Sequence, residues 1–96
     1  MYIVRETFIA KPGHAGELAE LMKKDMESWE DFKGQVMLDF VTDYNKIVIE
    51  YEINSLADFE NMMASFKKDQ AKAKSKKPPK YTELYVTGRR EIFRIV

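Results

Sequence analysis

Cysteine is absent from this 96-residue sequence, and histidine and tryptophan each occur once, as His14 and Trp29. Without cysteine, the chain cannot form disulfides, thiolate metal sites or a thiol nucleophile. No apolar stretch approaches the roughly 20 residues that span a bilayer. The charges at Arg5 and Glu6 interrupt the segment where a signal peptide would have its apolar core. We therefore expect one domain, residues 1–96, in the cytoplasm, with no metal, no cofactor and no membrane partner.

Charge is balanced over the chain but unevenly distributed. Residues 1–66 contain 13 acidic and 6 basic side chains, whereas residues 67–96 contain 3 acidic and 10 basic ones. Most of the basic excess lies in KKDQAKAKSKKPPK, the segment Lys67–Lys80. Clustered lysines can bind phosphates, but lysines late in a helix also favour the negative end of its dipole and then form a solvated loop. Since the segment has no arginine and the net charge is zero, we expect no nucleic-acid partner.

The first third of the sequence predicts one strand and one helix. Residues 2–10 are rich in β-branched and aromatic side chains, and both alternating faces are mostly apolar, as in a strand covered on both sides. We expect a helix to begin at His14, whose neutral imidazole can cap free amides, and to stop at Gly34. Its apolar residues, at helical spacing, are Ala15, Leu18, Ala19, Met22, Met26 and Trp29.

A second helix and further strands follow. Ser55 and Asp58 resemble a capping box, with aspartate in place of the usual glutamate, and predict the start of the second helix. The apolar stripe of this helix comprises Leu56, Phe59, Met63 and Phe66. The other extended segments are residues 35–42, 46–53, 81–86 and 91–96, of which the last two are interrupted by Gly88-Arg89-Arg90.

The element order β-α-β-β-α-β predicts an α+β, ferredoxin-like sandwich: a four-stranded antiparallel sheet with two helices on one face. RNA-recognition domains share this order, but residues 46–53 lack the glycine and the aromatic spacing of their RNA-binding motif. The sheet face opposite the helices carries apolar residues such as Ile3 and Ile9, which a monomer would expose. We therefore expect a homodimer in which two sheets pack face to face.

The strand followed by KPG and an amphipathic helix, the central hairpin and the closing segment GRREIFRIV together resemble the dimeric α/β-barrel superfamily. This superfamily includes antibiotic-biosynthesis-monooxygenase-like and NIPSNAP-like proteins, and the similarity covers nearly the whole chain in element order. The resemblance implies a homodimer that forms an α/β barrel and a small hydrophobic ligand between sheet and helices. It makes a cofactor-independent monooxygenase or isomerase one candidate function, and a non-catalytic dimeric interaction or regulatory module the alternative.

Haem degradation, which occurs in one branch of the superfamily, does not fit the residues of this chain. That branch has an asparagine on the first strand, seven positions before the turn glycine, and counting back from Gly13 gives Glu6. Its haem ligand is a histidine on the second helix, but residues 56–75 contain none. It also has a tryptophan near that helix, whereas Trp29 comes at the end of the first predicted helix.

Glu6 is the candidate catalytic residue. By strand alternation its side chain shares the helix-facing side with Tyr2, Val4 and Phe8. A carboxylate among apolar groups can act as a general base. The alternatives are a carboxylate paired with a lysine, one hydrogen-bonded to a tyrosine, or one that reaches solvent at the edge of the cleft.

The candidate ligand-binding residues are Tyr51, Tyr85, Met22 and Met63. A phenol can orient a ligand oxygen while its ring packs in the core, and thioethers adapt to irregular ligands. Ordinary core or interface packing is the simpler explanation of the same residues. The pair Arg89-Arg90 can hold an anionic ligand or form salt bridges, for example with the acidic half of a partner chain.

Overall fold

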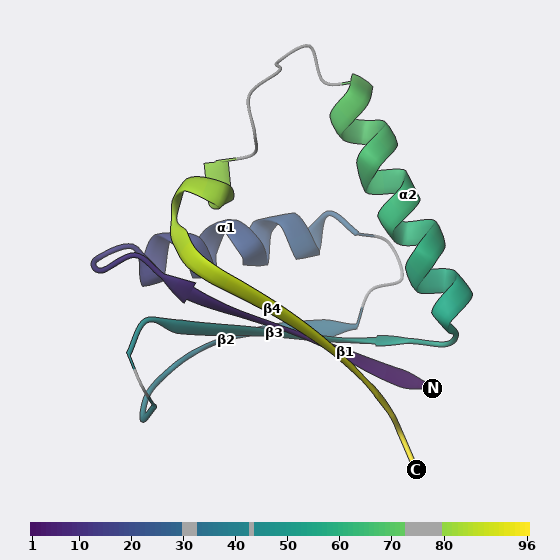
Figure 1. The fold of residues 1–96 in the computed structure, drawn as a ribbon, viewed down its shortest axis with the longest axis horizontal. Coiled ribbons are helices and arrows are strands. Elements are labelled where there is room, and N and C mark those ends of the chain that lie inside the picture. Colours follow the sequence, from purple (N-terminus) through teal and green to yellow (C-terminus); the bar gives the residue numbers. More distant parts are fainter. Residues whose placement is uncertain (30–32, 43, 73–79) are drawn as a thin grey trace.

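The structure, a computed structural model, describes residues 1–29, 33–42, 44–72 and 80–96. Its elements are β1 (Tyr2–Ala10), α1 (Ala15–Glu27), β2 (Gly34–Leu38), β3 (Lys46–Ile53), α2 (Leu56–Lys72), the 3-10 helix η1 (Lys80–Glu83) and β4 (Tyr85–Arg94). The strands form one antiparallel sheet in the order β2-β3-β1-β4, and both helices lie on one side of it (Figure 1). The predicted α+β, ferredoxin-like fold is confirmed.

The core lies between the sheet and α1. Side chains of β1 and β3 alternate between the face that the helices cover, here called the inner face, and the opposite outer face. The buried inner-face residues of these two strands are Val4, Ala10, Ile47, Ile49, Tyr51 and Ile53. From α1, Leu18, Met22 and Met26 pack onto them. Burying each large apolar side chain stabilises the fold by about 1.5–3 kcal/mol, so this layer holds the sheet and α1 together.

The second helix covers the sheet less completely than the first. The backbone N–H of Asp58 donates to Ser55 Oγ at 3.1 Å, which confirms the predicted cap. Figure 1 shows α1 lying along the sheet, whereas α2 rises steeply from the end of β3. Of its predicted apolar stripe, Leu56 is 49% exposed and Phe59, Met63 and Phe66 are only half-buried. Within the lysine segment, residues 67–72 form the end of α2, whereas residues 73–79 lie outside those described.

The first helix is shorter than predicted, because it ends at Glu27. The Ser28 hydroxyl donates to the Asp25 carbonyl at 2.6 Å and closes the last turn. Gly34 does not stop the helix but is the first residue of β2. A Cβ added to Gly34 would lie 2.7 Å from the Glu50 carbonyl oxygen, so a glycine is needed there for close packing of β2 on β3.

The hairpin between β2 and β3 also differs from the prediction, because β2 ends at Leu38 instead of continuing to residue 42. Beyond it, the Thr42 hydroxyl donates to Asp39 Oδ2 at 3.0 Å, a local bond that competes with strand pairing. Tyr44 and Asn45 adopt φ values of 75° and 57°, the left-handed conformation of a tight hairpin turn. The turn therefore occupies more of the chain than its composition indicated.

The last part of the chain is one strand preceded by a helical turn. Residues 80–83 form η1 and β4 begins at Tyr85, so the predicted strand over residues 81–86 is wrong in its first four residues. Strand β4 continues through residues 88–90, where a break was predicted, and pairs with β1 along its length. A Cβ on Gly88 would lie 3.1 Å from Phe8 Cε1. Gly88 makes room for an aromatic ring and does not break the strand.

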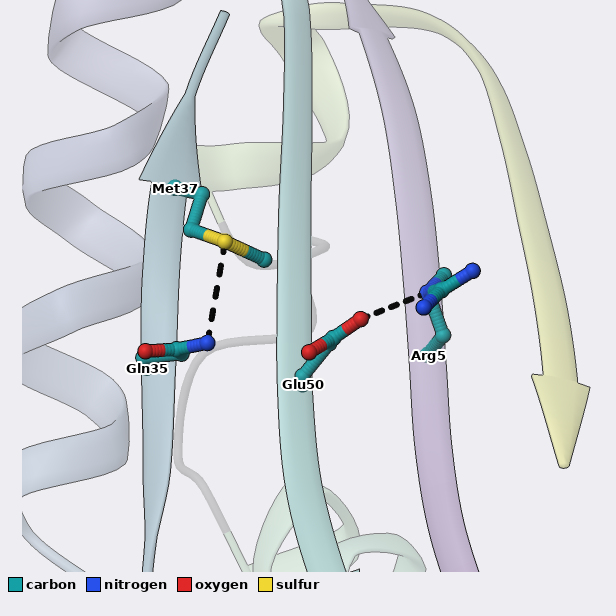
Figure 2. Close-up of polar contacts among 4 residues, drawn as sticks. All are labelled: Arg5, Gln35, Met37 and Glu50. Atoms are coloured by element: carbon teal, nitrogen blue, oxygen red, sulfur yellow. Dashed lines mark hydrogen bonds and ion pairs between the residues drawn. The ribbon is translucent and has the colours of Figure 1, made fainter. Parts of the chain in front are cut away.

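The outer face combines charged and apolar side chains. Arg5 Nε donates to Glu50 Oε1 at 2.6 Å, and the Arg5 guanidinium lies 5.2 Å from the centre of the Phe93 ring. Figure 2 shows this pair beside the 3.7 Å contact between Gln35 Nε2 and Met37 Sδ on β2. Apolar side chains of this face are Ile3, Ile9, Met37, Val48 and Phe93. The prediction of an apolar outer face therefore holds only in part.

Candidate functional site

Glu6 lies on the inner face of β1, between Ile49 of β3 and Arg90 of β4. Its side chain is 14% exposed. Arg90 Nε donates to Glu6 Oε1 at 2.6 Å, and Arg90 Nη2 lies 2.5 Å from the same oxygen. The structure thus puts Glu6 on the predicted face, and it pairs the carboxylate with an arginine, where the sequence had pointed to a lysine or a tyrosine.

Arg90 joins the sheet to the second helix. Its guanidinium lies 5.2 Å from the centre of the Phe59 ring on α2, a cation–π contact. Its neighbour Arg89 projects to the other side of the strand, where Nη2 lies 3.6 Å from Glu91 Oε2. Strand alternation therefore divides the predicted arginine pair, and only Arg90 reaches the inner face.

Tyr51 of β3 lies next to this ion pair and is 1% exposed. Burial raises the pKa of the Tyr51 phenol; the negative charge of Glu6 raises it further, and the positive charge of Arg90 opposes both effects. Its ring meets Trp29 edge-on, with centroids 6.0 Å apart. The phenol therefore stays protonated at neutral pH and can donate a hydrogen bond beside the carboxylate.

Two more tyrosines, Tyr81 and Tyr85, lie on the same face of the sheet as Glu6, Arg90 and Tyr51. The Tyr81 and Tyr85 rings stack with centroids 6.3 Å apart, and Tyr85 also contacts Phe8 at 5.0 Å. Burial is the largest cause of the raised pKa of Tyr81, followed by the charges of Tyr85, Asp25 and Glu6. Sequence reasoning missed Tyr81 because residues 81–86 were predicted as a strand, and the four-residue spacing of the tyrosines was the available signal. The inner cluster is defined here as Glu6, Tyr51, Tyr81, Tyr85 and Arg90.

The predicted methionines lie in different environments. Met22 of α1 is 8% exposed and belongs to the core. Met63 of α2 is only half-buried. Trp29, just beyond α1, packs on Phe66 of α2 with centroids 5.1 Å apart, so an aromatic contact links the two helices. Of the two methionines, Met63 is the more exposed.

His14 stands at the N-cap of α1, which confirms the predicted start of the helix, but the His14 side chain forms no capping hydrogen bond, so the predicted imidazole cap is wrong. Its Nδ1 lies 3.3 Å from Glu17 Oε2, and Lys80 Nζ lies 3.0 Å from Glu17 Oε1. Lys80 first, and then His14, lower the pKa of Glu17. Among the described residues, no group of three or more histidine, aspartate or glutamate side chains could hold a metal.

The described helices include none that is long and apolar enough to cross a bilayer.

A shallow hollow of about 420 Å³ lies on the outer face and extends over all four strands, from Met37 and Val48 to Arg89. It is separated from the inner cluster by the sheet itself. The outer face therefore has a broad concave surface of its own.

By sequence, the chain matches no protein-family profile and no curated protein. Solved structures match its fold over its whole length. A NIPSNAP domain protein from Burkholderia xenovorans aligns with a TM-score of 0.72 and 11% identity, over 100% of this chain and 95% of that one. A candidate antibiotic biosynthesis monooxygenase from Chloroflexus aurantiacus gives 0.71 and 16%, over 99% and 92%.

A variant of MhuD, solved with two manganese protoporphyrin IX molecules bound per active site, gives a TM-score of 0.73 and 15% identity, over 100% of this chain and 95% of that one. The chain therefore has the ferredoxin-like fold of NIPSNAP domain and antibiotic-biosynthesis-monooxygenase-like proteins. The predicted resemblance is confirmed at the level of the fold.

Proposed function

We propose that the chain is a small-molecule-binding protein whose ligand lies on the inner face, beside β4, η1 and α2. The observation that carries this proposal is the inner cluster, in which a carboxylate, a guanidinium and phenols lie together on the inner face and Arg90 opens the group to solvent. The half-buried stripe of α2 supports the same position, because a ligand placed there would cover it.

Glu6 is the proposed general base, and its chemistry requires that Arg90 release it. A freed carboxylate could take a proton from an acidic C–H or O–H group of the ligand. Tyr51 and Tyr85 would orient ligand oxygens, while Met22 and Met63 would line the apolar side. Such chemistry needs no cofactor for proton transfer, in keeping with a cofactor-independent monooxygenase or isomerase.

Haem does not fit as the ligand. Residues 56–75, most of which form α2, contain no histidine, and the sole histidine, His14, starts α1 and contacts Glu17. The porphyrin in the MhuD variant is thus evidence only that this fold can hold a ligand.

The alternative function is a non-catalytic dimeric interaction or regulatory module. One observation favours it: Glu6 is already paired with Arg90 at 2.6 Å, as a structural carboxylate would be. A purified protein that never turns over a ligand would fit this alternative. Turnover of a bound ligand by the wild type that stops in the Glu6→Gln variant would fit catalysis.

In either case we propose a homodimer through the outer face. Val48, half-buried at the centre of this face, would lie against the partner's sheet, and a ferredoxin-like sandwich with one bare sheet face gains stability by such packing. Val48→Asp should give a monomer in sedimentation velocity at micromolar concentration, while Val41→Asp, at an 86% exposed loop position, should remain dimeric. A wild-type monomer at that concentration would contradict the dimer.

Binding itself is testable with the neutral fluorescent probe N-phenylnaphthylamine. We expect saturable binding to the wild type. Phe59→Ala, which removes a half-buried ring beside Arg90, should weaken binding about tenfold, or about 1.4 kcal/mol. The matched control is Phe40→Ala, because Phe40 is 100% exposed on the β2–β3 loop. Equal binding by both variants, at comparable stability in urea, would contradict the proposed position.

A further inference from the structure

We propose that the ligand of the inner cluster carries an anionic oxygen group, such as a carboxylate, and that this group binds Arg90 in place of Glu6. The inference rests on the proposed function, because it names the chemical class of the ligand at that same site. It assigns Arg90 as the residue that determines ligand specificity and makes ligand binding the event that frees the Glu6 carboxylate.

The geometry of the ion pair leaves donors on Arg90 unused. A guanidinium has five N–H donors arranged to bind two oxygens of a planar anion side by side. Here Nε and Nη2 both contact a single oxygen, Glu6 Oε1. The two shortest contacts of the pair thus converge on one oxygen and do not form a fork on two oxygens. A bidentate ligand anion would use the arginine more fully than Glu6 does.

Exposure decides which partner a ligand can reach. The Arg90 side chain is 47% exposed and the Glu6 side chain 14%, so an incoming molecule meets the cation before the carboxylate. The residues around the guanidinium are aromatic, with Phe59 against it and the Tyr81–Tyr85 stack in the same cluster. The ligand class that fits is therefore an aromatic or otherwise apolar acid, with its charge at one end.

Arg89 provides an internal comparison. It is adjacent in sequence and equally cationic, but its side chain is 75% exposed on the outer face, near Glu91. If simple attraction between a positive chain segment and an anion were sufficient, both arginines would contribute. If the inner cluster recognises the anion, only Arg90 will.

The experiment uses two fluorescent probes with the same ring system, anilinonaphthalene sulfonate and the neutral N-phenylnaphthylamine. Charge-assisted hydrogen bonds to an arginine predict that Arg90→Gln weakens sulfonate binding by about tenfold or more and changes neutral binding less than about threefold. Arg89→Gln should leave both affinities unchanged. Glu6→Gln should bind the sulfonate several-fold more tightly than wild type, because the charge competing for Arg90 is gone.

Different results separate this inference from the proposed function. If Arg90→Gln binds both the neutral probe and the sulfonate as tightly as the wild type does, the anion proposal is overturned and the ligand site remains in place. An equal loss of both probes in Arg90→Gln would also overturn it, because Arg90 would then shape the site without recognising charge. If neither probe binds the wild type, the proposed function fails and the anion proposal fails with it. Arg90→Lys, with charge but no fork, should recover part of the sulfonate affinity if the proposal holds, and none if it is wrong.

Discussion

The coupling between Glu6 and Arg90 decides whether a ligand can exchange with the carboxylate, and it can be measured by a double-mutant cycle. Hydrogen bonds to charged groups are worth about 1.5–3 kcal/mol, while exposed ion pairs give about 0.2–1 kcal/mol. Glu6 is mostly buried and Arg90 is half-exposed, so solvent screens one side of the pair. We therefore expect a coupling free energy near 1 kcal/mol.

The assay is urea unfolding of wild type, Glu6→Gln, Arg90→Gln and the double variant, followed by circular dichroism. Loss of the contact between Arg90 and Phe59 occurs in both arginine variants and cancels in the cycle. Single-variant effects that add within about 0.3 kcal/mol would refute a stabilising pair. A coupling above about 3 kcal/mol, as for a locked buried pair, would instead refute exchange with a ligand and favour the non-catalytic alternative.

Two further predictions concern stability. Gly34→Ala should lower the free energy of unfolding by about 1–3 kcal/mol, because the new methyl meets the backbone of β3. Its control, Gly16→Ala on α1, where an added Cβ meets no atom within 4 Å, should raise the free energy of unfolding by about 0.5–1 kcal/mol. Urea midpoints test both variants, and equal effects would contradict the packing argument. Above pH 10 the unfolded chain loses the Tyr51 proton while the folded chain, in which the pKa of this phenol is raised, keeps it, so stability should fall by up to about 1.4 kcal/mol per pH unit. Tyr51→Phe should remove that part of the alkaline loss, and an unchanged slope would contradict the burial of this phenol.

Most of the fold could be predicted because periodicity is a local signal. Strands β1 and β3 and the start of α2 follow from alternation and from the Ser55 cap. The errors arise where residues distant in the sequence determine the local structure. Gly34 and Gly88 are typical of turns in a sequence, but in the structure they make room for β3 and for the Phe8 ring. A sequence shows the glycine and not the atoms that press against it.

The sequence predicted which face of the sheet the Glu6 side chain lies on, but not which side chains it contacts. Alternation correctly put Glu6 on the inner face, because side-chain direction follows from strand period alone. The pairing of Glu6 with Arg90 depends on the register between β1 and β4, which are 84 residues apart at this contact. Tyr81 depends on the helical turn η1. Both require the tertiary structure.

The most direct test of the ligand site is an NMR experiment on protein labelled at the methionine methyl groups, with N-phenylnaphthylamine added. Methionines lie on both sides of the sheet: Met63 is half-buried on α2, and Met37 is 37% exposed on the outer face, beside the shallow hollow. Binding at the inner cluster predicts nuclear Overhauser effects between the probe rings and the Met63 methyl group, with none to Met37. Effects to Met37 without any to Met63 would place the ligand on the outer face and contradict the account.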